Sequence, residues 1–505
     1  MLRRRKRPLV EAFRFPLGMA DGEDDLDLHG DATRAGASIP RKNATWNVEN
    51  APGHSNGQPR SDGTSSKAEE GSGDQRHSFT RAEYFTLISI ASVEFTSMMT
   101  NSVLVPFFPE EAAKKGASDT VVGLIFGVFS LVQLLFSLLL GKYMVKIGVK
   151  FTFLSGLLAS GTCTILFGLL DEAPSGKIFI ALCFLLHGVD AVGCAASMTA
   201  SFTILMSMFP HNISTTIGFL ELLTGLGLVM GPPLGGFLYE AWGYRMTLII
   251  VGVFMLLTIP VVLAALPPQV LVGSSGSFVR LLSLPSVIVV ALLICCVDSS
   301  MGFFDPNISL FLFEQFNLSS GKIGLVFMSL CISYSVSCPV VGYVSDHRPQ
   351  WMRCMMLAGA FVSGICFCLL GPVPILRIHT QLWLVVVVLA VLGVSIATAI
   401  VPTFSEILLM ATKNGFEEGL GTLGLVSGVC NGLMSFGNFI GPTLGGLLDD
   451  YVNFKWAATM EGLLLILAAF LMLAFYSYEC ISENRHRRTE ELLGDVEEAT
   501  RPLLS

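Results

Sequence analysis

Seven ionisable side chains lie inside long apolar stretches of this sequence, where a charge is costly. Six are acids and one is a histidine: Glu94, His187, Asp190, Glu221, Asp298, Asp305 and Glu406. No Lys or Arg lies deep in these stretches, so we expect the acids to lack fixed basic partners. A charge at the centre of a membrane helix costs at least about 2.5–3.5 kcal/mol. Such acids must be protonated, be in contact with water, or bind a mobile cation that is not part of the protein.

Isolated buried acids can exchange protons for cations. An apolar environment disfavours the charged form of a carboxyl group, so protonation and cation binding compete for one side chain. We predict this role for Glu94 and Glu221, which lie mid-stretch, and for Asp298.

The other acids have simpler alternatives. Asp305 precedes Pro306 and can instead hydrogen-bond a broken helix, and Glu406 lies nearer a helix end. Asp190 and His187 are three residues apart and can pair with each other. We keep Asp305 and Glu406 among the candidate proton-coupling residues.

Aromatic residues near the acids can box an ammonium group. Packing against lipid or core is the simpler interpretation for Phe303 and Phe304. Tyr334 has a polar tip that needs a partner, and we count it among the candidate substrate-binding residues.

The elements that must position these residues are membrane helices. The chain is 52% hydrophobic and only 14% charged, whereas soluble proteins carry about 25% charged residues. Apolar runs of about 20 residues span a bilayer as helices. Twelve such segments occur, at roughly 82–106, 119–141, 150–170, 177–206, 214–240, 245–266, 284–312, 320–343, 352–371, 381–410, 419–447 and 455–478.

This composition predicts an all-α polytopic membrane protein and excludes a soluble enzyme. No nucleotide-binding loop, metal cluster or basic nucleic-acid face is visible, so we expect no enzyme activity, cofactor, metal or nucleic-acid partner. The twelve cysteines show no disulfide or zinc spacing.

We expect five parts along the chain. A disordered tail covers 1–80, and six-helix halves cover 81–266 and 284–478. A linker covers 267–283 and a second polar tail 479–505. Basic residues flanking the outer helices place both tails and the linker in the cytosol. These residues are Arg76, Arg81, Arg485, Arg487 and Arg488.

A repeat supports the two halves. Residues 218–236 and 428–446 both fit G-x8-G-x3-G-P-x2-G-G, 210 positions apart. The fixed residues are Gly218, Gly227, Gly231, Pro232, Gly235 and Gly236, then Gly428, Gly437, Gly441, Pro442, Gly445 and Gly446. Glycines at this spacing let another helix approach closely, and Gly-Pro allows a bend. Two copies at one offset predict parallel repeats.

The repeat also relates the polar residues of the two halves. VEFTSM at 93–98 resembles VDSSM at 297–301, so we expect Glu94 to mirror Asp298. The 210 offset makes Asn431 the mirror of Glu221, and we add Asn431 to the candidate site. The segments that carry these residues would face a central cavity between the halves.

The two glycine stretches resemble the antiporter motif of the major facilitator superfamily, and GKYMVKIGVK at 141–150 resembles its loop motif after the second helix. The loop motif departs at Val145, where an Asp is usual, whereas GYVSDHR at 342–348 keeps Asp346. VQLLFSLLLG at 132–141, DPNISLFL at 305–312 and ISYSVSCPVVGYVSD at 332–346 are similar to the vesicular amine transporters. The resemblance covers about 82–478 and implies a major facilitator fold with twelve helices.

Departures from the monoamine and acetylcholine members imply a rebuilt site. Their second-helix Lys falls on Ser130, and their Asp residues of helices 10 and 11 fall on Pro402 and Asn431. Glu221 is an added acid. A more acidic cavity suits a cation with several charges, so the vesicular polyamine transporter branch fits best.

The resemblance implies a proton-coupled antiporter that loads organic cations, such as spermidine and spermine, into acidic secretory or synaptic-type vesicles. Its partners would be the cation, protons and membrane lipid, and EEATRPLL near the C-terminus resembles an adaptor-binding dileucine signal. Two alternatives stay open: a plasma-membrane multidrug or organic-cation antiporter, and a transport-dead scaffold.

Overall fold

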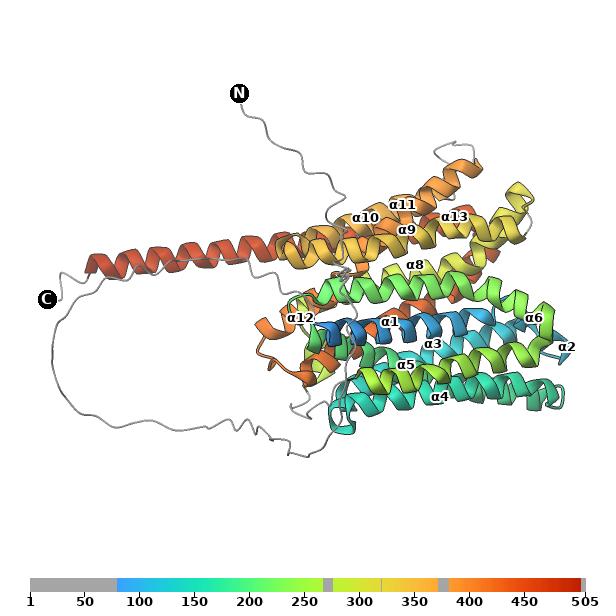
Figure 1. The fold of residues 1–505 in the computed structure, drawn as a ribbon. Coiled ribbons are helices and arrows are strands. Elements are labelled where there is room, and N and C mark those ends of the chain that lie inside the picture. The colour runs from blue at the N-terminus through green and yellow to red at the C-terminus, as the bar shows by residue number, and fades with distance from the viewer. Residues whose placement is uncertain (1–79, 267–275, 319, 371–380, 501–505) are drawn as a thin grey trace, which may run out of the picture. The chain divides into compact units, whose positions relative to one another are not determined.

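The computed structural model describes residues 80–266, 276–318, 320–370 and 381–500. The expected tail over 1–80 and most of the linker therefore lie outside the described residues. The described part belongs to one compact unit, Arg76–Ser505, and contains helices and no strand (Figure 1). The helices are α1 (Arg81–Val103), α2 (Phe108–Lys114), α3 (Asp119–Ile147), α4 (Val149–Leu169), α5 (Lys177–Met208), α6 (Ile213–Ala265), α7 (Phe278–Leu282), α8 (Pro285–Phe316), α9 (Ser320–His347), α10 (Met352–Leu370), α11 (Leu382–Ile400), α12 (Thr403–Lys413) and α13 (Leu420–Thr500).

The helices are long and apolar enough to cross a membrane as the sequence predicts. Ten pass this test among the described residues, or eleven if α1 and α2 form one bent span. In this number of spans, α6 is taken as a single helix, although Gly243 interrupts it with a φ of 76°. Glycine adopts this backbone conformation without the clash of a Cβ, and Figure 1 shows α6 turning back on itself. Its two arms, taken separately, give the twelve predicted spans.

Helix α13 is longer than the sequence suggests. It contains two apolar stretches, Leu420–Thr443 and Phe454–Arg485, and continues as helix to Thr500. The polar segment that we expect as a second tail from 479 is therefore helical up to that residue.

The two halves pack by equivalent helix pairs. Inside each half, α1 lies on α6 and α8 lies on α13. Between the halves, α6 lies on α9 and α13 lies on α3. A Cβ at Gly218 would collide with the carbonyl of Cys338, and one at Gly428 would collide with the carbonyl of Ser137. The repeated glycines thus mark the same crossing on both sides of the molecule.

Candidate functional site

Glu94 lies in the middle of α1 with its side chain fully buried. The hydroxyl of Ser201 on α5 donates a hydrogen bond of 2.5 Å to Oε1. The second carboxyl oxygen is buried without a hydrogen-bond partner. Since an unsatisfied buried acceptor is costly, this oxygen is a candidate position for a proton or a cation.

Glu221 lies on α6 and connects the two halves. The hydroxyl of Tyr334 on α9 donates a hydrogen bond of 3.0 Å to its Oε2. Tyr334 therefore has the partner that its polar tip requires, and that partner is a candidate acid. Glu221 is also close enough to Glu94 and Asp298 for their charges to interact.

Asp298 lies on α8 beside the repeated glycine Gly437 of α13. A Cβ at Gly437 would lie 2.6 Å from the Cβ of Asp298, so only glycine permits this approach. The side-chain amide of Asn438 donates a hydrogen bond of 3.3 Å to one carboxyl oxygen. The other, Oδ2, is buried and unpartnered.

Glu94, Glu221 and Asp298 form the acidic cluster of the candidate site. Within the described residues, no Lys, Arg or His forms a salt bridge with any of the three. Three acids linked through Glu221, without a fixed base, can hold protons, or a mobile cation in their place.

Asn431 lies on α13 in a polar network between the halves. Its amide donates to the hydroxyl of Ser137 on α3 at 3.0 Å and to that of Thr199 on α5 at 3.2 Å. Ser427 and Thr203 extend the network with hydroxyls 2.8 Å apart. Asn431 thus sits at the crossing equivalent to that of Glu221, as the 210 offset predicts.

The expectation that every buried acid lacks a base is wrong for Glu406. Nε of Arg353 on α10 lies 2.6 Å from its carboxyl oxygen, and a second guanidinium nitrogen lies 2.7 Å from Glu479 on α13. The guanidinium also stacks over the ring of Tyr476. Arg353 lies near the beginning of its apolar stretch and not at the centre. The sequence therefore did not indicate that its long side chain reaches a buried acid.

The remaining candidates lie elsewhere. Asp190 accepts a hydrogen bond from Ser160 on α4 instead of from His187, whose ring packs among Phe126, Phe129 and Phe167. Phe303 stacks on Phe454, and Phe304 packs on Phe327. Asp305 lies within α8, but its side chain is outside what the structure describes, and Gly445 and Gly446 lie within α13.

The predicted mirror relation between Glu94 and Asp298 is one helical turn out of register. A Cβ at Gly227 would meet the carbonyl of Phe95, and one at Gly437 would meet that of Cys295. Equivalent residues of α1 and α8 are therefore 200 positions apart, whereas the matched letters gave 204. The residue equivalent to Asp298 is Met98.

Sequence reasoning missed Glu461, a buried acid on the last apolar stretch. The signal was present, because this Glu follows an apolar run and precedes Gly462 and further apolar residues. A buried acid inside a predicted span is the same criterion that selected the other candidates.

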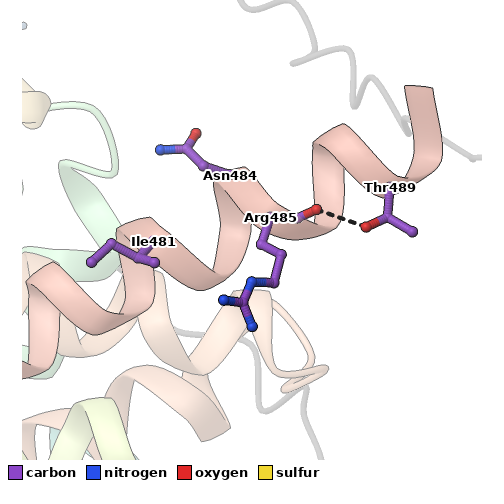
Figure 2. Close-up of a pocket in the computed structure, with 4 residues that line it drawn as sticks. All are labelled: Ile481, Asn484, Arg485 and Thr489. Atoms are coloured by element: carbon purple, nitrogen blue, oxygen red, sulfur yellow. Dashed lines mark hydrogen bonds between the residues drawn. The ribbon is translucent and has the colours of Figure 1, made fainter. Parts of the chain in front are cut away.

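One pocket lies on the polar part of α13 (Figure 2), lined by Ile481, Asn484, Arg485 and Thr489. The hydroxyl of Thr489 donates to the carbonyl of Arg485 at 2.9 Å. None of these four described residues is an acid or an aromatic residue, so they do not resemble a cation site.

The sequence matches a family model described as Major Facilitator Superfamily over residues 90–416 and 290–505. It is 48% identical to the human MFS-type transporter SLC18B1 over 421 residues, which are 83% of this chain and 92% of the relative. It is 24% identical to the mouse synaptic vesicular amine transporter over 376 residues, 74% of this chain and 69% of that protein.

A solved structure shares the fold. The crystal structure of the human organic anion transporter MFSD10 (TETRAN) matches with a TM-score of 0.65 and 15% identity. The match covers 77% of this chain and 99% of that chain. At this identity the likeness concerns the fold alone.

Proposed function

Because the chain belongs to the major facilitator superfamily, in the family of the MFS-type transporter SLC18B1, we propose that it exchanges protons for small organic cations. The relatives found in the comparison are transporters and include vesicular amine transporters, so a transport-dead scaffold is the weaker alternative. The observation that carries the proposal is the acidic cluster, Glu94, Glu221 and Asp298. Glu221 is close enough to interact with each of the other two, and within the described part of the chain none of the three forms a salt bridge with a basic residue.

In the proposed cycle, lumenal protons bind the acidic cluster and displace the cation. The two halves then rock, the protons leave to the cytosol, and the charged acids bind the next cation. Hydrogen bonds at the beginning of α6 support a structure closed at that end. Asp346 of α9 accepts from the backbone amides of Ser214 and Thr215 at 3.0 and 2.7 Å, and the hydroxyls of Ser214 and Ser405 are 2.7 Å apart.

Polyamines are the substrates that we propose. Two or more interacting carboxylates favour a ligand with more than one positive charge, since each charge of the ligand can replace a proton. Ser130 stands where related transporters have a lysine, which leaves the cluster without that competing charge.

We further propose a vesicle membrane as the location, because the amine-transporting relatives are named synaptic vesicular. A plasma-membrane antiporter would use the same site. Staining of the tagged chain together with a vesicle marker and a surface marker distinguishes the two.

The direct test is uptake by the purified full chain in proteoliposomes with an acidic interior. We expect labelled spermidine and spermine to accumulate more than serotonin or acetylcholine, and accumulation to stop when the pH gradient is collapsed. Glu94→Gln and Glu221→Gln should each abolish uptake. Glu240→Gln changes an exposed acid on the same helix as Glu221 and is the matched control. Uptake that survives the double change at Glu94 and Glu221 would contradict the assignment.

A further inference from the structure

Glu461 lies on the second apolar stretch of α13, inside the carboxyl-terminal half. It is 7% exposed, and its Oε1 has no hydrogen-bond partner. Ser299 on α8, itself 4% exposed, is a polar side chain that lies near the carboxyl group. Ser299 directly follows Asp298 of the acidic cluster.

The repeat indicates that packing does not require an acid at this position. A Cβ at Gly252 would meet the carbonyl of Gly161, and one at Gly462 would meet that of Gly364, so the 210 offset extends to this helix. It makes Val251 the counterpart of Glu461. By the 200 offset, Met99 is the counterpart of Ser299.

The amino-terminal half fills the same place with apolar side chains. Val251 and Met99 are 2% and 4% exposed and belong to one hydrophobic cluster. The carboxyl-terminal half instead keeps an acid and a hydroxyl there, at the cost of an unsatisfied buried oxygen. A polar pair where the fold accepts an apolar one indicates a function.

The groups around Glu461 leave it free to exchange a proton. The thiol of Cys296 on α8 and the hydroxyl of Ser299 lie near it, and Cys368 of α10 lies beside Gly462. Among the described residues, Glu461 forms no salt bridge with a Lys, Arg or His.

We propose that Glu461 is a second proton-binding site, separate from the acids that bind the cation. Its contacts with α8 and α10 place it within one half, where a proton fits and a polyamine does not. A proton bound at Glu461 neutralises a buried charge between α13 and α8, and its release restores that charge. Glu461 thereby gives the carboxyl-terminal half a protonation step of its own, which the pH gradient can drive. This inference rests on the proposed function.

The test compares two assays on the full chain in proteoliposomes. The first is accumulation of labelled spermidine driven by a pH gradient. The second is exchange of labelled for unlabelled spermidine at equal pH on both sides, which needs cation binding and movement of the halves but no net proton transfer. We expect Glu461→Gln to reduce gradient-driven accumulation to the level of protein-free liposomes while exchange continues at the wild-type rate. Glu461→Asp, which keeps the acid, should restore accumulation.

Each result bears on one claim. If Glu461→Gln keeps both activities, the proposal is overturned. It is equally overturned if both are lost together, because the acid then serves folding or cation binding. The Val251→Gln variant of the amino-terminal counterpart is the control for a polar residue at this depth, and it should retain gradient-driven accumulation. A wild-type chain that exchanges spermidine but never accumulates it would contradict the proposed antiport itself.

Discussion

At the scale of single residues, the structure distinguishes buried acids that keep an unpartnered oxygen from one that is paired with an arginine. Glu406 is 1% exposed and held by Arg353, so it behaves as part of the framework. Glu94 and Asp298 each keep a buried oxygen without a partner. The same residue type in the same apolar setting therefore has two roles, and the neighbour decides which.

Removing Arg353 should destabilise the fold more than removing Glu479, its half-buried partner. Arg353→Ala leaves Glu406 as a buried charge without a base, which costs about 3 kcal/mol. Glu479→Gln removes one partly solvated ion pair and leaves Arg353 with Glu406, so we expect a loss of about 1 kcal/mol. Thermal unfolding in detergent, followed by tryptophan fluorescence, should show a clearly lower midpoint for the first variant only. Equal midpoints would mean that Glu406 finds another partner.

Sequence alone could find most of the acids but not their partners. Glu94, Glu221 and Asp298 stand out because apolar neighbours surround them in the chain. The Ser201, Tyr334 and Asn438 partners come from helices 107, 113 and 140 positions away, and no local pattern encodes such pairs. The pairing of Arg353 with Glu406 was not predicted for the same reason, since the two residues are 53 positions apart.

At the scale of helices, the repeated glycines differ in how closely a neighbouring helix approaches them. Gly227 and Gly437 each face the backbone of a crossing helix, and a Cβ would overlap it, whereas a Cβ at Gly236 would meet nothing within 4 Å. The sequence motif treats all three as equivalent. The structure shows that the motif marks a close crossing at some positions and an open face at another.

Alanine at these positions should separate the two groups. Gly227→Ala forces α1 and α6 apart, and overpacking of this kind costs about 1–3 kcal/mol. Gly236→Ala should be silent. The fraction of monodisperse protein in size-exclusion chromatography and the rate of cation exchange measure both effects. A silent Gly227→Ala would show that the helices can shift without loss.

The contact between α9 and the beginning of α6 depends on one carboxylate. Asp346 accepts from the amides of Ser214 and Thr215 and from the hydroxyl of Thr215. Its counterpart in the last turn of α3 is Val145, which is apolar and buried. A carboxylate therefore caps the contact between the halves on one side and has no equivalent at the matching position on the other.

Asp346→Asn should weaken this closed end. A hydrogen bond to a charged group contributes about 1.5–3 kcal/mol, so the open population should rise several-fold or more. Spin labels on Lys146→Cys and Lys413→Cys, in a cysteine-depleted chain, would report a longer distance. Thr215→Val removes a single hydrogen bond and should cause a smaller shift. An unchanged distance in both variants would exclude the cap as a determinant of closure.

At the scale of the whole molecule, the repeat predicts the architecture and the structure corrects its details. The twelve spans, the two halves and the packing of glycine-rich helices follow from composition and one offset. The break at Gly243 falls between the predicted segments 214–240 and 245–266. The continuation of α13 to Thr500 was not predicted, because the polar composition of that segment does not indicate a helix.

A cross-link between the halves should stop transport. The hydroxyls of Thr203 on α5 and Ser427 on α13 are 2.8 Å apart, which is close enough for cysteines at these positions to form a disulfide. Oxidation of Thr203→Cys/Ser427→Cys should abolish cation exchange, and reduction should restore it. The single Thr203→Cys variant should be insensitive to oxidation. Continued exchange after complete cross-linking would show that these helices do not separate during the cycle.

The 200-residue relation between α1 and α8 has a geometric consequence. Because Asp298 matches Met98 and Glu94 matches Ile294, the two acids are offset by four residues along the helix axes, a rise of about 6 Å. If both acids bind cations, as we propose, a long molecule with a positive group near each end can contact both at once, whereas a compact one contacts a single acid. The offset between the two copies of the repeat would then set the spacing between positive groups in the preferred molecule.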